Sequence, residues 1–549
     1  MSDPAAAEAV VRKLGRPALL SRLFGRGKQP LRLTAVPRDH VQGDRARGDQ
    51  LFAGKLIRGS EMLALPDVDF AQIGTTGPLA EELQGFSWLR DLAAAASRER
   101  GARLAEAIAG RWLLTHGTRI DAAWAPALWG ERLLFWTAYA PYLLSSSDGG
   151  YRSALLNTVA RGGRHLAGTA DGAAPGLPRI TAWAGLTAGG LLLQGGLHRV
   201  ARAEAGLLRA LATGQSEDGG LLSRNPAEQA LLVDRLGLLR AAYGAAKQAM
   251  PDGLESAATA ALAALHGVTM GDGALGSWQG GNPGEMARMA ALVDGCGLRA
   301  RPLRQARGWG YQRLGALGTV IVVDAAPPPA TRMARIGSAS TLAFELSDGA
   351  QRLVVNCGGP GLLPTAIPPE LAQALRTTAA HSTLTLGDTN STAIMPDGSL
   401  GKGVEDVTLN RVEDNEFSRL EASHDGYLRG YGLLHHRNMA LANDGKEVRG
   451  LDKLGPRGRK KIKKSAAYAI RFHLAPGVDA VRTADGMGAI LRSPGAPPWN
   501  FRCRGAQLDV EESVWVDGQG GLIGTMQLAI VGEVSALGAE IGWQFRRSS

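Results

Sequence analysis

The spacing of apolar residues changes once along this 549-residue chain, and that change limits the folds that it can adopt. Over residues 79–266, apolar side chains recur every three to four positions, which is the period of an amphipathic helix. From about Trp309 onward, the apolar runs are short, alternating or β-branched, and turn residues bound them. The sequence therefore predicts a multidomain α and β protein whose helices precede its strands.

The first half of the chain carries several segments that are long enough to be helices. Each spans roughly 14 to 22 residues, which suits a helix better than a strand. Consecutive helical hairpins are typical of an α/α bundle, a solenoid or an incomplete toroid, and the pattern does not choose between them. The segments expected to be helical are residues 88–109, 127–144, 152–167, 180–193 and 198–212.

The second half carries short runs that predict the strands of an all-β, sandwich-like domain. Each run alternates between apolar and polar residues or is rich in β-branched residues. The runs expected to be strands are residues 317–324, 341–344, 352–356, 382–386, 407–412, 435–442, 467–474, 488–491, 501–508 and 521–532.

The length of the chain exceeds what one hydrophobic core supports, so we expect two domains and a tail. We predict a basic, partly irregular N-terminal tail over residues 1–48. A helical domain should follow over residues 49–305, and a β-sandwich domain over residues 306–549. Residues 51–68 should form a small strand-bearing preface to the helices.

The charge balance favours an anionic partner, because the net charge is +10 and the pI is about 9.7. Nucleic acid, acidic polysaccharide and anionic lipid all qualify. The basic cluster over residues 457–464 has no interleaved aromatic residues, so we interpret it as a solvated loop. Residues 9–24 leave two interpretations open: a basic amphipathic helix on a membrane surface, or an irregular tail interrupted at Gly15 and Pro17.

The compartment is also predicted from simple features. The sequence shows no secretory signal and no run of about 18 apolar residues that could cross a membrane. Its three cysteines, Cys296, Cys357 and Cys503, are odd in number and far apart, so no disulfide framework follows from them. By sequence alone we therefore expect a cytoplasmic location.

The phrase from Asp218 to Gln229 is a candidate binding segment in the helical half. Its Asp-Gly-Gly turn is followed by Asn225 and Pro226, a pair suited to cap and start a helix. The same loop also places Arg224 beside Asn225, and a guanidinium or amide there could hold a sugar carboxylate. The two interpretations are compatible, because loops at helix starts often carry function.

Histidine and tryptophan supply the other candidates. His381 stands at the head of an alternating strand, where it could be a catalytic imidazole or a satisfied core residue. The spacings around it match no standard zinc pattern. Seven of the eleven tryptophans precede residue 300, and core packing explains most of them. Trp278 is the exception, because it lies in a glycine-rich loop where it could stack on a sugar ring.

Several phrases together resemble the heparinase II/III-like family of polysaccharide lyases. They are Asn356-Cys-Gly-Gly-Pro-Gly361, the His381 strand, His424-Asp-Gly-Tyr427 and Arg471-Phe-His473, in this order. The resemblance implies an N-terminal incomplete (α/α) toroid followed by a C-terminal antiparallel β-sandwich, with the site in the groove between them. It further implies a carbon–oxygen lyase that cleaves an acidic, uronate-containing glycan by β-elimination. Family members commonly work in the periplasm or cell envelope.

The resemblance also assigns roles to particular residues. His381 occupies the family's β-domain histidine position, and Arg224 with Asn225 lies in the phrase that helps to bind the substrate carboxylate. Gln229 stands where family lyases carry a histidine, and Trp278 stands near the position of the catalytic tyrosine. A tyrosine is needed to share proton transfer with His381. The residues that could replace the missing one are Tyr243, Tyr311 and Tyr427.

Three hypotheses about function follow. The first is an active lyase, and the second is a catalytically weakened glycan-binding relative. The third is a basic protein that contacts an anionic membrane through its N-terminus or binds nucleic acid, although nucleic acid is not expected. Thr383 replaces a histidine that helps to hold a structural metal in some family members, so we predict no metal and no other cofactor.

Overall fold

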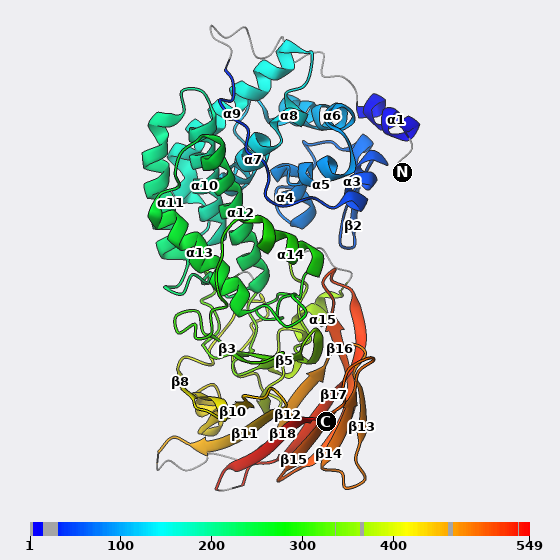
Figure 1. Cartoon of the computed structure of the whole chain (residues 1–549), viewed down its shortest axis with the longest axis vertical. Helices are drawn as coiled ribbons and strands as arrows, with labels where there is room; N and C mark the ends of the chain where they lie inside the picture. Colours follow the sequence, from blue (N-terminus) through cyan, green and yellow to red (C-terminus); the bar gives the residue numbers. More distant parts are fainter. Residues whose placement is uncertain are drawn as a thin grey trace.

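The computed structural model describes residues 4–14, 31–334, 336–362, 367–458, 465–535 and 537–548. The molecule is elongated, with the helices gathered in one half and the two large sheets in the other (Figure 1). The helical half is an incomplete (α/α) toroid, and the second half is an antiparallel β-sandwich. The fold class predicted from the sequence is therefore confirmed.

The chain begins with a short helix that packs on the helical domain. Helix α1 (Pro4–Leu14) buries Val10 and Leu14, and the guanidinium of Arg111 on α6 caps its C-terminal end. The Arg111 Nε donates to the carbonyl of Leu14 at 2.8 Å, and Nη2 donates to that of Lys13 at 2.9 Å. The apolar face expected within residues 9–24 is thus used inside the protein as far as Leu14. Residues 15–30 lie outside the described residues.

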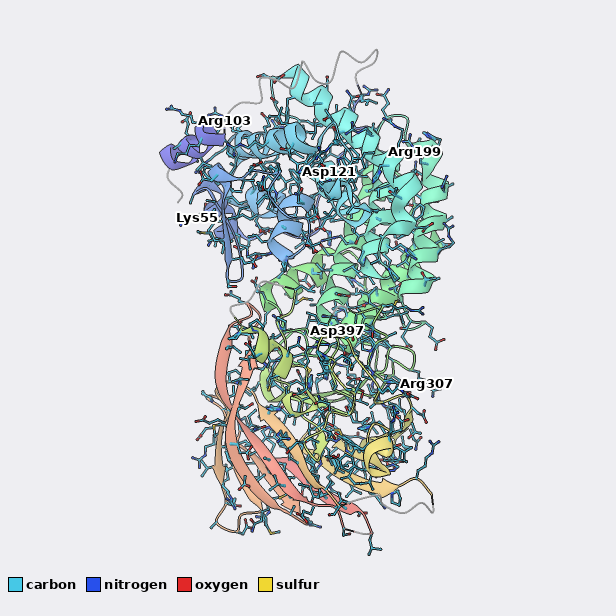
Figure 2. The ribbon with its side chains drawn as sticks, turned by 180° about the vertical axis from the view of Figure 1, so that it is seen from behind. Lys55, Arg103, Asp121, Arg199, Arg307 and Asp397 are labelled. Atoms are coloured by element: carbon cyan, nitrogen blue, oxygen red, sulfur yellow. The ribbon has the colours of Figure 1, made fainter. Side chains whose placement is uncertain are left out.

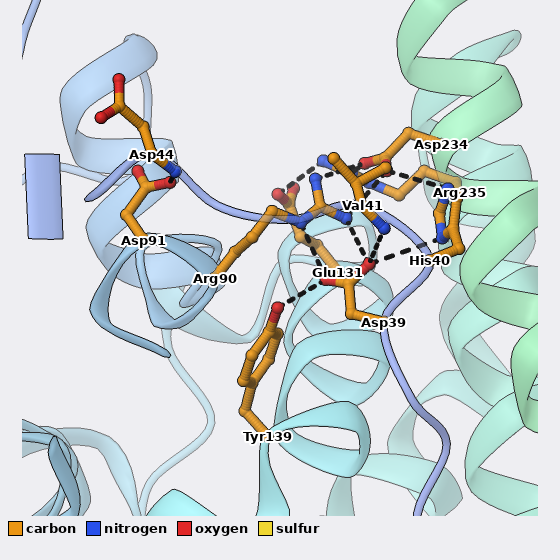
Figure 3. A network of polar contacts seen from close by, with 10 residues as sticks. All are labelled: Asp39, His40, Val41, Asp44, Arg90, Asp91, Glu131, Tyr139, Asp234 and Arg235. Carbon is orange, nitrogen blue, oxygen red and sulfur yellow. Dashed lines mark hydrogen bonds and ion pairs between the residues drawn. The ribbon is translucent and has the colours of Figure 1, made fainter. Parts of the chain in front are cut away.

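The next segment, residues 31–44, crosses the helical domain and is anchored in it. Thr34 donates its backbone N–H to the carbonyl of Leu192, which fixes one end. Further along, Asp39 and His40 enter a buried network of charged residues between the helices (Figure 3). The predicted N-terminal tail therefore contains a segment that is built into the helical domain. The short strands β1 (Lys55–Arg58) and β2 (Glu61–Ala64) then form the expected preface.

The helices predicted from the apolar spacing are confirmed, with two divisions. The segment 88–109 is split because Ala96 adopts an extended conformation, and the segment 127–144 is split at Tyr139. The helices are α3 (Arg45–Phe52), α4 (Pro78–Gly85), α5 (Leu89–Ala95), α6 (Arg98–His116), α7 (Pro126–Ala138), α8 (Ala140–Leu143), α9 (Gly149–Thr169), α10 (Leu177–Leu192), α11 (Val200–Gly214), α12 (Pro226–Ala245), α13 (Asp252–Gly267) and α14 (Met286–Gly295). None of the helices in the described ranges is long and apolar enough to cross a membrane.

Helix α10 is the centre of the helical layer and is almost entirely buried. It crosses α7 at backbone contact, which requires glycine on both helices. A Cβ atom on Gly130 would lie 2.2 Å from the carbonyl oxygen of Thr181, and one on Gly185 would lie 2.2 Å from that of Gly130. The early tryptophans fill the space beside this crossing; Trp112, Trp129 and Trp136 pack around the buried guanidinium of Arg132.

The β half consists of two packed antiparallel sheets. In the first sheet the order is β13 (Asp479–Arg482), β14 (Gly488–Arg492), β15 (Trp499–Arg504), β18 (Ala539–Arg547), β11 (Glu447–Pro456), β10 (Leu433–Ala442), β9 (Phe417–His424) and β8 (Val407–Glu413). In the second it is β16 (Gln507–Val516), β17 (Leu522–Glu533), β12 (Ala467–Leu474), β6 (Gln351–Val355), β5 (Phe344–Asp348), β4 (Thr319–Asp324) and β3 (Tyr311–Ala316), with β7 (Leu384–Leu386) paired to β12.

Most of the predicted strands are present, but the run 341–344 was wrong, because residues 341 and 342 form a turn and β5 starts at Phe344. Other strands were missed. The run 501–508 contains the end of β15 and the start of β16, and β3, β9, β11, β13 and β18 were not expected. Most of these strands carry many charged or small residues on their solvent faces, so their alternation is weak. Between the sheets, Phe344 and Trp543 stack at 5.5 Å, and the buried Arg437 pairs with Asp452.

Candidate functional site

A groove opens where loops of the two halves meet, near Asp397 in Figure 2. It encloses about 320 Å³, and a neighbouring hollow of about 590 Å³ shares part of its lining. On the helical side, the groove is lined by the connection between α9 and α10 and by the start of α12. On the β side, it is lined by residues 329 and 331–334, by Gly337 and Arg376, and by the loop 397–400. The residues common to both hollows are Pro175, Pro329, Arg332 and Met333.

His381 does not line this groove. It follows a short 3₁₀ turn, Thr378–Ala380, and is only 2% exposed. Its Nδ1 lies 2.7 Å from the carbonyl oxygen of Thr377, so this nitrogen carries the proton and donates it. Burial lowers the pKa of the imidazole to about 4. His381 is therefore neutral near pH 7, and protein atoms surround it.

The three candidate tyrosines are buried, and each hydroxyl donates to a protein acceptor. The Tyr243 hydroxyl lies 2.6 Å from Glu204 on α11, well inside the helical domain. The Tyr311 hydroxyl donates to the carbonyl of Arg224 at 2.7 Å, and the Tyr427 hydroxyl donates to that of Leu384 at 2.8 Å. Burial raises the pKa of all three hydroxyls. The structure does not bring any of them into a hydrogen bond with His381.

Arg224 lies at the domain junction and forms contacts in several directions. Its Nη2 pairs with Asp324 at the end of β4, and its Nε donates to the carbonyl of Trp309 at 2.8 Å. Its Nη1 donates to the carbonyl of Pro327 at 2.6 Å. The backbone of Arg224 is in the left-handed region, with a φ of 57°, two residues before α12 begins. The guanidinium is therefore used to hold the two halves of the protein together.

Asn225 and Gln229 are also hydrogen-bonded inside the protein. The predicted helix cap is confirmed, because Asn225 Oδ1 accepts from the N–H of Ala227 at 2.8 Å. Its Nδ2 donates to the carbonyl of Gln279 at 3.1 Å. Gln229 accepts from the N–H of Leu221 at 2.8 Å and donates to the carbonyl of Ala261 at 2.8 Å. Both amides thus fix the loop that precedes α12.

Trp278 is 1% exposed and packs against Tyr311, with 5.2 Å between the ring centroids. Its position in a glycine-rich loop therefore does not expose the ring. The following residue, Gln279, reaches across the junction instead. Its Nε2 donates to Ser340 at 2.9 Å and lies 3.4 Å from Asp324, and its Oε1 accepts from the N–H of Ser338 at 2.9 Å.

Asp324 is the centre of this junction, and sequence reasoning did not select it. Its carboxylate accepts from Arg224, Gln279 and the Ser340 hydroxyl, the last at 2.6 Å. It is fully buried and comes from the apolar run that forms β4. An acidic residue that ends such a run was the available signal. Together these contacts form a carboxylate-binding pocket whose carboxylate belongs to the protein.

Comparisons with known proteins agree with this architecture. Residues 298–544 match the family model described as Heparinase II/III-like, C-terminal. The β half of the chain is therefore similar to the C-terminal domain of heparinase II/III-like proteins. Within the described residues, this protein has no group of three or more histidine, cysteine or acidic side chains that could hold a metal ion.

Solved structures resemble it over nearly its whole length. The crystal structure of heparinase III aligns with a TM-score of 0.67 at 11% identity, covering 100% of this chain and 85% of that one. Heparan sulfate lyase HepC from Pedobacter heparinus, in a mutant form, aligns with a TM-score of 0.63 at 14% identity, covering 99% and 88%. At such identities the likeness establishes the fold of this chain.

A curated relative has a different name. FtsZ-localized protein C of Caulobacter vibrioides is 27% identical over 545 residues, which cover 95% of this chain and 91% of the relative. The alignment includes both the helical and the β half.

Proposed function

We propose that this protein binds an acidic glycan in the groove between its two domains without cleaving it. It would then be the catalytically weakened, glycan-binding relative that the sequence leaves open. The observation that carries the proposal is the position of Asp324. This side chain of the protein occupies the guanidinium and amide donors that a uronate carboxylate would need.

Cleavage by β-elimination makes demands that these contacts do not meet. The substrate carboxylate must be neutralised so that the neighbouring proton becomes acidic, and Arg224 is already paired with Asp324. A base must then reach that proton, and an acid must reach the leaving oxygen. His381 is sealed behind protein atoms, and the hydroxyls of Tyr311 and Tyr427 are directed at backbone carbonyls. An active lyase would have to rearrange this junction before each turnover.

The groove itself keeps groups that can bind an anionic sugar. Arg332 lies in the lining shared by both hollows, and no described residue forms an ion pair or hydrogen bond with it. A free guanidinium can bind a carboxylate or a sulfate through two parallel hydrogen bonds. The Ser223 hydroxyl also lines the groove and has no hydrogen-bond partner among the described residues. Arg376, by contrast, donates to the carbonyls of Gly337 and Gly398.

The proposal is tested by measuring cleavage and binding on the same samples. The wild-type protein is incubated with a panel of acidic polysaccharides, and the absorbance of unsaturated uronate is followed. We expect no absorbance, together with saturable binding by calorimetry. Arg332→Ala should weaken binding about tenfold, the effect of losing one charge-assisted contact worth roughly 1.5 kcal/mol. Arg202→Ala on α11 is the matched control, because it removes an exposed arginine far from the groove.

The lyase hypothesis predicts the opposite result. Unsaturated products would appear with at least one substrate, and His381→Ala would lower turnover by on the order of 10²-fold while binding persisted. That outcome would overturn the proposal. If Arg332→Ala left glycan binding unchanged, the proposal that the glycan binds in the groove would be wrong.

A second part of the proposal concerns where the protein acts. Because the alignment with FtsZ-localized protein C spans both halves of the chain, we infer that this protein also localises with FtsZ. A fluorescent fusion expressed in its own cells, imaged together with FtsZ, should give coincident bands. Diffuse fluorescence in cells that contain FtsZ rings would contradict this inference.

A further inference from the structure

A further hollow lies on the outer face of the first sheet and shares no lining residue with the groove or with the hollow beside it. It encloses about 470 Å³ over strands β8 to β11. Strand β10 alternates strictly between buried and half-buried residues, so His435 points into the core whereas His436 points outward. The hollow is lined by Thr408, Leu409, Asn410, Glu421, Ala422, His436, Asn438, Leu451 and Lys453.

The lining forms two rows that run across the strands. The strand register places Thr408, Ser423, His436 and Lys453 side by side in one row. It places Asn410, Glu421, Asn438 and Leu451 side by side in the next. Neighbouring strands lie about 4.8 Å apart, and the rows are about 6.8 Å apart along the strands. The result is a small grid of hydroxyl, amide, carboxylate and imidazole groups.

The row beyond Asn410, Glu421 and Asn438 carries long charged side chains. Arg419 and Arg449, in this row, each stack on the ring of Phe417 and pair with Asp414 and Glu447, respectively. That row behaves as an ordinary solvated face. In the hollow, by contrast, no described residue forms a hydrogen bond or ion pair with the side chain of His436 or Asn438.

The charges of the hollow point to an uncharged ligand. Lys453 pairs with Glu540 at 3.6 Å, and Glu421 lies 3.4 Å from the Asn410 amide, so neither sign dominates. The Glu421 carboxylate would repel an acidic sugar, whereas it can accept hydrogen bonds from hydroxyl groups. Amide groups and a neutral imidazole can each both donate and accept. Such a grid is complementary to a molecule rich in hydroxyl groups.

We propose that the outer hollow over β8 to β11 is a binding site for a neutral saccharide, held by Asn438, Glu421 and His436. The site does not depend on the groove and would give the protein a second contact with a glycan. Two sites on one chain would raise the overall affinity for a polymer that reaches both of them.

The test is calorimetry of the full-length protein with neutral hexose and N-acetylhexosamine oligosaccharides. We expect binding that changes little with salt, because no net charge is neutralised. Asn438→Ala combined with Glu421→Gln should weaken it at least tenfold. Asn500→Ala is the control, since it removes an amide from the same sheet outside the hollow, on β15. Arg332→Ala should leave this binding intact.

Three outcomes would overturn the proposal. They are no binding of any neutral oligosaccharide at millimolar concentration, binding that the double variant leaves unchanged, and preferential binding of acidic oligosaccharides that the double variant weakens. Loss of neutral-sugar binding in Arg332→Ala would place the site in the groove instead. Because the groove proposal is read out with acidic glycans and Arg332, either proposal can fail while the other holds.

Discussion

Among the buried clusters of arginine and carboxylate, the one in the helical half and the one at the domain junction differ in what they join. In the helical half, Arg90 contacts Asp39 at 2.8 Å and Asp234 at 2.8 Å, which fastens the N-terminal segment between α5 and α12 (Figure 3). At the domain junction, Arg224 pairs with Asp324 and fastens the helical half to the sandwich. The residue types are the same, yet only the second cluster occupies a position that the family resemblance links to substrate binding.

Residue type alone therefore does not distinguish a structural ion pair from a ligand-binding site. A guanidinium whose N–H groups are occupied by the protein's own acceptors has few or none left for a ligand. What separates the two roles is a guanidinium that lines a hollow and has no partner among the described residues, as at Arg332. The following predictions test whether the junction behaves like the helical cluster or like a site.

The largest effect is expected for Arg90→Ala. It leaves the carboxylates of Asp39 and Asp234 buried without their main counter-charge, and breaking a buried pair costs about 3 to 5 kcal/mol. We expect the free energy of unfolding, measured by urea denaturation, to fall by about 5 kcal/mol. Arg202→Ala on the outer side of α11 should change it by less than about 0.5 kcal/mol. A small loss for Arg90→Ala would show that the segment is not fastened by these contacts.

Asp324→Ala should destabilise the protein by about 3 kcal/mol, because Arg224 then lacks its buried partner. This variant also empties the carboxylate pocket. Added formate should therefore restore part of the lost stability in Asp324→Ala, whereas it should have no such effect on Arg90→Ala at equal ionic strength. If formate rescued neither variant, the description of the junction as an occupied carboxylate site would be wrong.

His381 predicts a pH dependence of intermediate size. Its pKa in the folded protein is about 4, below the usual 6.5, so only the unfolded chain binds this proton between those values. Stability should therefore fall as the pH is lowered from 6.5 toward 4, by about 1.4 kcal/mol for each unit. His381→Asn should show a correspondingly shallower loss in denaturation curves recorded between pH 6.5 and 5. Equal slopes would mean that the imidazole is open to solvent.

The smallest effect on stability is expected for Arg332→Ala. The side chain makes no ion pair or hydrogen bond with a described residue, so the free energy of unfolding should change by less than about 0.5 kcal/mol. Its effect should appear in glycan affinity alone. A loss of stability comparable to that of Asp324→Ala would show that Arg332 makes a structural contact instead.

The sequence predicted the order of the domains well because that order depends on local periodicity. Helices such as α9 and α11 follow directly from apolar spacing, and the Asn225 cap follows from residue type. The candidate site was less predictable. Whether Arg224 is free depends on Asp324, which lies 100 residues further along the chain, and no local pattern records that pairing.

The cluster around Arg90 could not be predicted from the sequence for the same reason. Arg90 meets Asp39 across 51 residues and Asp234 across 144. The prediction of an irregular tail over residues 1–48 followed from glycine, proline and basic residues. It could not include Asp39 and His40, whose burial depends on helices that come much later.

The anchored segment has a practical consequence for anyone who shortens this chain. A boundary drawn before α3 would look reasonable, since residues 31–44 are mostly irregular. It would nevertheless remove Asp39 from its ion pair with Arg90 and remove His40 from its close packing against Gly237 and Gly295. Trimmed versions that begin at Arg45 would therefore precipitate, and glycan binding lost in them would say nothing about where the sugar sits.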